Sequence, residues 1–348
     1  GQFRKATAIP YIVHPLEVLQ ILYSMRADTN LMIAGVLHDT VEDTTMTHAE
    51  VKKEFGETIA DLVDGVTKIG KVPLQTKEEQ QAENIRKILM AMSKDIRVII
   101  IKLADRLHNI RTLNFVAPQK RRDKALETLE IYAPIANRLG ISKVKWELED
   151  LCLRYLEPEA FYDLVERISM KRNEREEYIQ DIIRKLHTEL DKVGVKAEIS
   201  GRPKHFYSIY NKMKKQNTAF EGIYDLFAIR IILDSPLDRE KLDCWQVYSI
   251  ITDMYRPNPK RLRDWLSVPK ENGYESLHTT VLGPEEKWVE VQIRTRRMDE
   301  VAEKGVAAHW AYKGVDGTKL NTDNQSVYVF TPTGDLKRLS AGATVLDF

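Results

Sequence analysis

The sequence predicts a multidomain protein of the α and α+β classes, with a helical first half followed by a mixed α/β region. The length of 348 residues exceeds the usual length of a domain with a single hydrophobic core. Apolar residues follow helical spacing in the first half, and short β-branched runs alternate with helical patterns from about residue 196. We therefore expect a helical domain over 1–118, a helical connector over 119–195, a mixed domain over 196–315, and a linker with a small β unit over 316–348.

The first domain is predicted to be helical because two apolar runs carry helix signals. Leu31–Leu37 is an unbroken apolar run, and residues 28–30 before it are possible N-caps. A helix that is apolar all round is a buried helix. Ile96–Leu107 repeats the pattern, although its β-branched residues are also compatible with a strand. The spacing from Asp105 to Asn109 favours a helix there.

The connector contains a charged stretch, Glu174–Lys192, that also holds apolar residues at helical spacing. This pattern predicts an amphipathic helix packed on another element. The apolar positions are Tyr178, Ile179, Ile182, Ile183, Leu186 and Leu190.

In the mixed region, strand and helix patterns alternate. Strands are expected at Val195–Ser200, Leu226–Leu233, Thr279–Leu282 and Trp288–Ile293. Helices are expected at Pro203–Lys215 and Arg239–Tyr255. A polar linker over 314–325 leads to a further strand, Val327–Phe330.

The composition excludes several classes of protein. Hydrophobic residues make up 43% and charged residues 30%, as in ordinary globular proteins. The net charge of +1 argues against a general nucleic-acid or membrane binder, and no apolar run approaches the ~20 residues that cross a bilayer. Cys152 and Cys244 form neither a disulfide framework nor a CxxC pair, so a reducing cytoplasm is the expected compartment.

Histidine and aspartate residues in the first domain predict a metal site. His14 precedes Pro15 at an expected helix start, His38 and Asp39 end a buried helix, and Asp105 lies in the second apolar run. Imidazole and carboxylate groups together suit Mn²⁺, Fe²⁺ or Zn²⁺. Two of each leave coordination positions for water and substrate, and a bound ion would lower the pKa of that water.

Two further acids follow the His-Asp pair. Glu42 and Asp43 lie four residues after His38 and Asp39, so a continuing helix would stack them above the ligands. They could assist proton transfer. A single His-Asp pair is usually a solvated helix end, but the full combination of ligand types favours metal chemistry. His48 and His108 are not part of this pattern of candidate ligands and are expected to be surface or supporting residues.

A second constellation, in the mixed domain, predicts a nucleotide site. On the helix expected from Pro203, Lys204, Ser208 and Lys212 would share one face, which suits a triphosphate. Asp225 precedes one strand, while Glu290 and Gln292 share a face of another. Two such acids can hold Mg²⁺, and one of them could take the proton of an attacking hydroxyl.

Basic and aromatic residues accompany this site. Asn272-Gly273-Tyr274 is a turn that would expose a ring able to stack on a base, with His278 close behind it. Basic helices are mostly solvated, and a lone tyrosine more often packs in a core, so these patterns alone leave nucleotide binding open. The added positive charge comes from Arg256, Lys260, Arg261 and Arg263.

With both constellations, the chain closely resembles the Rel/SpoT-type bifunctional guanosine tetra- and pentaphosphate synthetase–hydrolase family over about residues 3–315. The resemblance implies an all-helical HD-type hydrolase domain, a helical connector, a mixed-sheet nucleotidyltransferase-like synthetase domain and the start of a TGS-like module at Val327–Phe348. The motifs that carry it are Tyr11–Pro15, His38–Thr44, Lys102–Leu113, Gly201–Lys212, Tyr224–Leu233, Arg261–His278, Val289–Thr295 and Val306–Tyr312.

For the HD domain, the resemblance implies removal of pyrophosphate from the 3′ position of (p)ppGpp. Glu42 and Asp43 would be the catalytic acids. Mn²⁺ would be held by His14, His38, Asp39 and Asp105. The residues that would hold the nucleotide are Arg4, Lys5, Asn109 and Thr112.

For the second domain, the resemblance implies transfer of the β,γ-pyrophosphate of ATP to the 3′-OH of GDP or GTP. Asp225 and Glu290 would hold Mg²⁺, with Glu290 also the base, and Tyr274 would stack on the acceptor guanine. The phosphate-contacting residues would be Arg202, Lys204, Ser208, Lys212 and Arg263. Further nucleotide-binding positions would be Lys270, Asn272, His278 and Gln292.

The resemblance also carries wider expectations. The basic sequence of residues 261–264 is typical of family members with an active hydrolase. The family senses the ribosome and uncharged tRNA through a C-terminal region that this sequence lacks. Because two opposed activities would otherwise cycle wastefully, we expect the connector 119–195 to link the sites so that one is favoured at a time.

Three alternatives are weighed against this hypothesis. An HD phosphohydrolase of another nucleotide with a sensor as its second domain would not need both Asp225 and Glu290. A tRNA-type nucleotidyltransferase would place the transferase first and carry a paired Asp-x-Asp, whereas Phe227 follows Asp225 at that spacing. An RNA-binding scaffold would lose nothing on Asp225→Ala.

Overall fold

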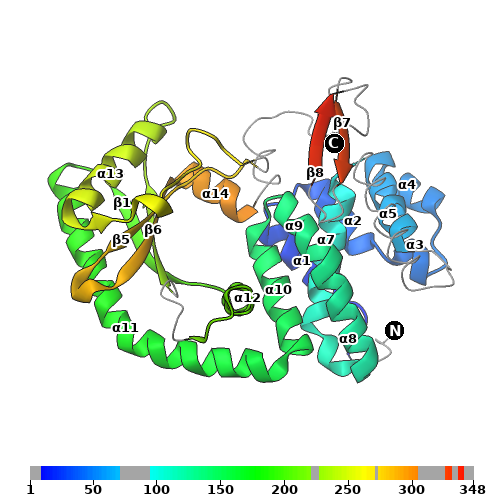
Figure 1. The fold of residues 1–348 in the computed structure, drawn as a ribbon. Coiled ribbons are helices and arrows are strands. Elements are labelled where there is room, and N and C mark those ends of the chain that lie inside the picture. The colour runs from blue at the N-terminus through cyan, green and yellow to red at the C-terminus, as the bar shows by residue number, and fades with distance from the viewer. Residues whose placement is uncertain are drawn as a thin grey trace. The chain divides into compact units, whose positions relative to one another are not determined.

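The computed structural model describes residues 9–70, 95–220, 227–270, 273–304, 326–330 and 336–340 (Figure 1). The chain divides into two compact units. Unit 1 comprises residues 1–117, 130–134 and 310–348, and unit 2 comprises residues 118–129 and 135–309. The motif over 306–312, the linker over 314–325, and Arg4, Lys5, Asp225 and Asn272 lie outside the described residues.

The described residues of unit 1 up to position 117 form helices, as predicted. Asp28 caps α2 by accepting the backbone N–H of Leu31 at 2.9 Å. The ambiguous apolar run is a helix, α7, buried along most of its length. The helices are α1 Val13–Ser24, α2 Thr29–Leu37, α3 Thr40–Asp43, α4 His48–Phe55, α5 Glu57–Gly70 and α7 Arg97–Arg111, followed by the 3₁₀ turn η1 Leu113–Phe115.

The packing of α1 against α2 depends on a glycine. A Cβ atom at Gly35 would overlap Cδ1 of Leu22, which is fully buried. The two helices therefore approach closely, and this brings His14 on α1 near His38 at the end of α2.

The strand predicted at Val327–Phe330 is β7, Ser326–Phe330, which pairs antiparallel with β8, Leu336–Ser340.

Unit 2 begins with helices and ends in a sheet. The predicted amphipathic helix is the C-terminal part of α11, and its apolar positions, such as Ile182 and Leu186, are buried in the core. The helical elements before the sheet are α8 Pro118–Glu127, the π-helix η2 Thr128–Tyr132, α9 Ala133–Arg138, α10 Ser142–Leu156 and α11 Pro158–Lys192. Both η2 and α9 have residues in each of the two units.

The sheet has the strand order β1-β2-β6-β5-β3, with β4 also paired to β5. It is mixed because β2 and β6 run parallel while the other pairs are antiparallel. The strands are β1 Ala197–Pro203, β2 Phe227–Leu233, β3 Arg256–Pro257, β4 Arg263–Asp264, β5 Leu277–Leu282 and β6 Trp288–Thr295. Between and after them lie α12 Phe206–Gln216, α13 Glu240–Met254, η4 Pro259–Arg261, η5 Pro284–Glu286 and α14 Arg296–Lys304.

The two faces of this sheet differ in character. Ile229 and Val291 are register partners in the apolar core, which also contains residues of α11 and α13. Side chains alternate between faces along a strand, so the partners Arg230 and Gln292 lie on the opposite face. Glu290, two residues before Gln292 on β6, lies on that same face, opposite the apolar core.

One predicted boundary is wrong. Pro203 ends β1, where it pairs with Phe227, so the helix expected from Pro203 begins only at Phe206. Backbone pairing with β2 holds residue 203 in the extended conformation, which overrides the local helical pattern.

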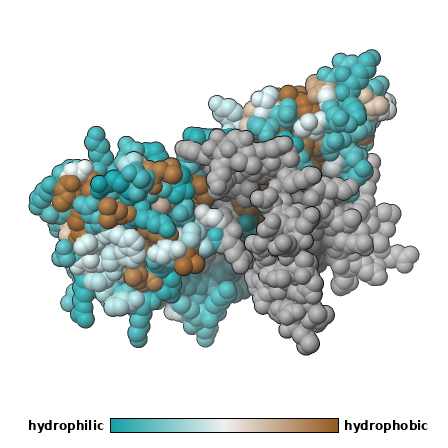
Figure 2. All heavy atoms as spheres, turned by 90° about the horizontal axis from the view of Figure 1, so that it is seen from above, coloured by the Kyte–Doolittle hydropathy of each residue, from teal (hydrophilic) through white to brown (hydrophobic). Residues whose placement is uncertain are grey.

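None of the helices within the described ranges is long and apolar enough to cross a membrane. The face of these residues seen in Figure 2 is largely hydrophilic, with apolar side chains in scattered groups.

Candidate metal centre and nucleotide site

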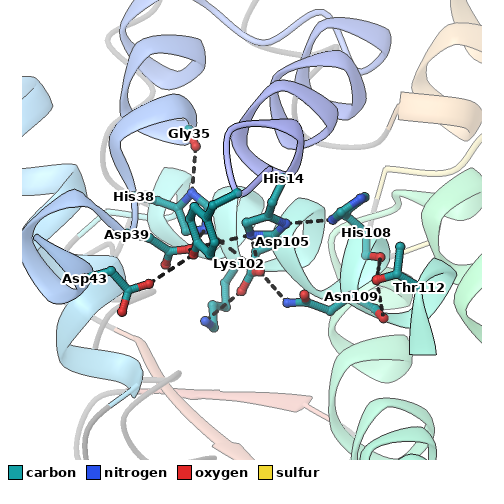
Figure 3. Close-up of polar contacts among 11 residues, drawn as sticks. His14, Gly35, His38, Asp39, Asp43, Lys102, Asp105, His108, Asn109 and Thr112 are labelled. Atoms are coloured by element: carbon teal, nitrogen blue, oxygen red, sulfur yellow. Dashed lines mark hydrogen bonds and ion pairs between the residues drawn. The ribbon is translucent and has the colours of Figure 1, made fainter. Parts of the chain in front are cut away.

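The four predicted metal ligands converge in unit 1. His14 lies near the start of α1, His38 and Asp39 follow α2, and Asp105 lies in the middle of α7. Figure 3 shows their side chains pointing toward one another. Ligand atoms of His14, His38 and Asp39 lie within 4.8 Å of one another. Asp105 Oδ1 is 3.3 Å from His14 Nε2 and 3.9 Å from His38 Nε2.

Hydrogen bonds orient the two histidines so that Nε2 faces the cluster. Nδ1 of His38 is 2.7 Å from the carbonyl oxygen of Gly35. Because a carbonyl can only accept, Nδ1 carries the proton and a neutral His38 presents the lone pair of Nε2. Nδ1 of His14 is 2.7 Å from Nδ1 of His108. Buried imidazole nitrogens beside two carboxylates are a donor set that fits a divalent transition metal.

Asp105 is held in its charged form by its neighbours. Burial opposes ionisation, but Lys102 and the two histidines outweigh it and hold the pKa of Asp105 well below its ordinary value. Lys102 Nζ is 2.8 Å from Oδ2, and Asn109 Nδ2 donates to Oδ1 at 2.5 Å. Asn109 thus touches a predicted ligand, and Thr112 closes the end of α7 by donating to the carbonyl of His108 at 3.1 Å.

The two predicted catalytic acids do not stack on a continuous helix. The helix is interrupted at His38 and Asp39, between the end of α2 and the start of α3. Both acids lie exposed on the short helix α3. Asp43 is nevertheless linked to the cluster because the hydroxyl of Tyr11 donates to Asp39 and, at 3.0 Å, to Asp43. The sequence alone indicated no role for Tyr11 or Lys102, and His108 is a supporting residue rather than a surface one.

In unit 2, the predicted base Glu290 is surrounded by three of the predicted site residues. Lys204 Nζ is 3.2 Å from Oε2, Gln292 Nε2 donates to Oε1 at 2.8 Å, and His278 Nδ1 is 3.9 Å away. Burial raises the pKa of Glu290, but the charge of Lys204 and the hydrogen bond from Gln292 outweigh burial and hold that pKa below its ordinary value. Lys204 precedes α12, so it does not share a helix face with Ser208 and Lys212, contrary to the prediction.

An aromatic group borders Glu290. Tyr274 Oη is 2.8 Å from His278 Nε2, and the Trp265 ring meets both rings edge-on. Burial lowers the pKa of His278 to about 3, so its imidazole is neutral at ordinary pH. Lys270 Nζ lies 4.1 Å from the centre of the Trp265 ring. Tyr274 is only partly exposed, where a freely presented ring was expected.

The remaining predicted phosphate contacts lie on β1, α12 and β4. Arg202 is on β1, with its guanidinium 3.7 Å from the centre of the Trp146 ring. Ser208 and Lys212 are partly buried on α12, and Arg263 is exposed on β4, where it pairs with His278 of β5. Arg263 donates to the carbonyl oxygens of Lys260 and Leu262.

Two family models match the chain, one over the first part and one over the second. Residues 1–142 match the model of the HD domain, and residues 201–316 match the model of the region found in RelA / SpoT proteins. The chain is thus an HD-domain protein that also carries a RelA/SpoT region, and it belongs with the RelA/SpoT proteins.

Its relatives include proteins with names for both activities. The chain is 43% identical over 382 aligned positions to "GTP pyrophosphokinase" of Myxococcus xanthus, covering 100% of this chain and 50% of that protein. It is 42% identical over 380 positions to "Bifunctional (p)ppGpp synthase/hydrolase SpoT" of Escherichia coli strain K12, covering 100% and 53%. The chain therefore spans about half the length of the curated relatives it matches.

Proposed function

We propose that this chain is the catalytic part of a bifunctional alarmone enzyme. It would transfer pyrophosphate from ATP to the 3′-OH of GDP or GTP, and it would hydrolyse (p)ppGpp to GDP or GTP and pyrophosphate. The proposal is carried by one observation, the presence in one chain of the His14–His38–Asp39–Asp105 cluster and of the Lys204–Glu290–Gln292 group. The names of the relatives support both activities.

In the hydrolase, His14, His38, Asp39 and Asp105 would hold Mn²⁺, which supplies a Lewis acid and an activated water when bound. Tyr11 joins Asp39 to Asp43 and so keeps that acid beside the centre. Asp43 and Glu42 would move the protons of the reaction. Nucleotide would be held by Asn109 and Thr112 at the end of α7, together with Arg4 and Lys5.

In the synthetase, the 3′-OH of the acceptor attacks the β-phosphorus of ATP and AMP leaves. Glu290, kept ionised by Lys204, would take the hydroxyl proton and, with Asp225, hold Mg²⁺. Tyr274, fixed by His278, would stack on the guanine. The phosphate and nucleotide contacts would come from Arg202, Lys204, Ser208, Lys212, Arg263, Lys270, Asn272, His278 and Gln292.

Two assays on the same preparation test the proposal. The first supplies ATP and GDP with Mg²⁺, and the second supplies ppGpp with Mn²⁺. Asp39→Ala is expected to abolish hydrolysis and leave synthesis intact, and Asp225→Ala or Glu290→Gln should do the reverse. Removing metal with a chelator should stop both. If Asp39→Ala also abolished synthesis in a folded protein, or if neither product formed with wild type, the assignment would be wrong.

We further propose that the whole protein works in the reducing cytoplasm and responds to the ribosome and uncharged tRNA. Both cysteines are buried and form no disulfide, which is compatible with that compartment. Co-sedimentation of the full-length protein with ribosomes carrying uncharged tRNA tests the second part. Recovery of the protein in the ribosome-free fraction under those conditions would contradict it.

A further inference from the structure

One face of α10 contacts the segment that runs from the end of β1 into α12. Val144 and Leu148 of α10 are buried, whereas Trp146 is partly exposed on another side of the helix. Trp146, Glu149 and Asp150 stand at positions i, i+3 and i+4, so they share a face. That face meets residues 202–207, which hold predicted phosphate contacts of the synthetase.

Trp146 holds the guanidinium of Arg202. The guanidinium carbon lies 3.7 Å from the centre of the indole ring, the geometry of a cation–π contact. Burial, with the nearby charge of Arg230, lowers the pKa of Arg202 to about 10, so the side chain stays charged at neutral pH. An arginine fixed on a ring face loses less rotamer freedom when it binds an anion.

The other two residues of the face hold the start of α12. His205 stacks on Trp146, with ring centroids 5.4 Å apart, and its Nε2 is 3.3 Å from Glu149 Oε2. His205 is the N-cap of α12 but makes no capping hydrogen bond. Instead, Asp150 accepts the backbone N–H of Tyr207 at 2.8 Å. A carboxylate from a neighbouring helix therefore caps the N-terminus of α12 in place of the His205 side chain.

We propose that Trp146 and Asp150 are positioning residues for the ATP substrate of the synthetase. Trp146 fixes the guanidinium of Arg202, and Asp150 fixes the first turn of α12, which carries Ser208. Both act through other residues, so neither needs to touch the nucleotide. This inference rests on the proposed function and adds to it that α10, a helix of the expected connector, builds part of the triphosphate site.

The test compares Trp146→Ala and Trp146→Phe in the synthesis assay, with the KM for ATP and for GDP measured separately. Trp146→Ala should raise the KM for ATP about tenfold and leave the KM for GDP within about twofold, because one cation–π contact has been lost. Trp146→Phe retains a ring face and should recover most of the affinity. Trp245→Ala on α13, whose ring contacts Tyr248, is the matched control.

A double-mutant cycle shows whether Trp146 acts through Arg202. In an Arg202→Ala background, Trp146→Ala should cause no further loss of ATP affinity. Asp150→Ala should raise the KM for ATP, whereas Asp150→Asn, which keeps an accepting oxygen for the Tyr207 N–H, should not. Unchanged ATP affinity in a folded Trp146→Ala protein, or a full effect without Arg202, would overturn the inference.

Titration with a non-hydrolysable ATP analogue and Mg²⁺ separates this inference from the proposed function. If wild type makes no product, the proposed function fails, and the analogue still decides the role of Trp146. Weaker analogue binding to Trp146→Ala than to wild type supports the inference. Equal binding, or none to either protein, overturns it.

Discussion

At the scale of single residues, His108 sets the orientation of a predicted metal ligand. It is buried on α7, and its Nδ1 meets Nδ1 of His14 from α1. In the tautomer that leaves Nε2 of His14 for an ion, the N–H at Nδ1 of His14 donates a hydrogen bond to Nδ1 of His108. Such partners of metal-bound histidines hold the ring in place and raise its basicity.

His108→Ala is expected to weaken Mn²⁺ binding about 10- to 100-fold, because His14 loses the partner that orients it. Calorimetric titration of metal-free protein with Mn²⁺ measures the change. His48→Ala, the same substitution at a half-exposed histidine paired with Asp61, is the control and should bind normally. Equal affinities of the His108 and His48 variants would contradict this role.

Tyr11 is the second residue whose role depends on a contact across the fold. Tyr11→Phe removes the hydroxyl that joins Asp39 to Asp43, so the kcat of hydrolysis should fall about tenfold or more as Asp43 loses its orientation. Burial and the two carboxylates raise the pKa of Tyr11, so the hydroxyl is a neutral donor at all ordinary pH values. Steady-state hydrolysis of ppGpp is the measurement. Tyr23→Phe, at an exposed tyrosine on α1, should leave the kcat unchanged.

At the scale of elements, the metal cluster depends on how closely α1 and α2 pack. Gly35 permits that approach because a Cβ there would meet Leu22. The carbonyl of the same glycine accepts the hydrogen bond that orients His38. One position therefore serves both helix packing and ligand geometry.

Gly35→Ala should lower the free energy of unfolding, because overpacking costs about 1–3 kcal/mol. The better helix propensity of alanine offsets up to about 1 kcal/mol of this. Urea denaturation measures the difference. Leu22→Val, which lacks the δ-carbons, should remove most of the penalty when it is combined with Gly35→Ala. The overlap would be refuted by an equal cost of Gly35→Ala in both backgrounds.

At the scale of the whole molecule, each unit encloses its own candidate site, and unit 2 also encloses both cysteines. Cys152 and Cys244 are fully buried. Burial, with Glu240 and Asp243 nearby, raises the pKa of Cys244 to about 12. Because the thiolate is the reactive form, the native thiol is unreactive until pH approaches that value.

Labelling with iodoacetamide at pH 8 should therefore be at least about a hundredfold slower at Cys244 in the native protein than in urea. Peptide mass spectrometry follows each site. Leu237→Cys adds a thiol at a 77% exposed position and is the internal control for reagent activity. Equal labelling of Cys244 in the native and unfolded protein would show that unit 2 does not bury it.

Much of the fold could be predicted from local patterns. The apolar runs before His38 and around Asp105 are the helices α2 and α7, and the spaced apolar residues of α11 are buried in unit 2. The main strands agree within a few residues. These features depend on periodicities of 3.6 and 2, which neighbouring residues determine. The prediction that a helix begins at Pro203 is wrong because pairing with a distant strand determines the backbone conformation there.

By itself, the sequence determined the types and spacing of the chemical groups, namely the His and Asp ligands and the acids Glu42, Asp43 and Glu290. Only the tertiary structure decided which groups meet. His108 reaches His14 across 94 positions, and Lys204 reaches Glu290 across 86. Arg202 rests on Trp146 of another helix. The physical reason is that local propensity sets the direction of a side chain on its own element, whereas its partner depends on how elements pack.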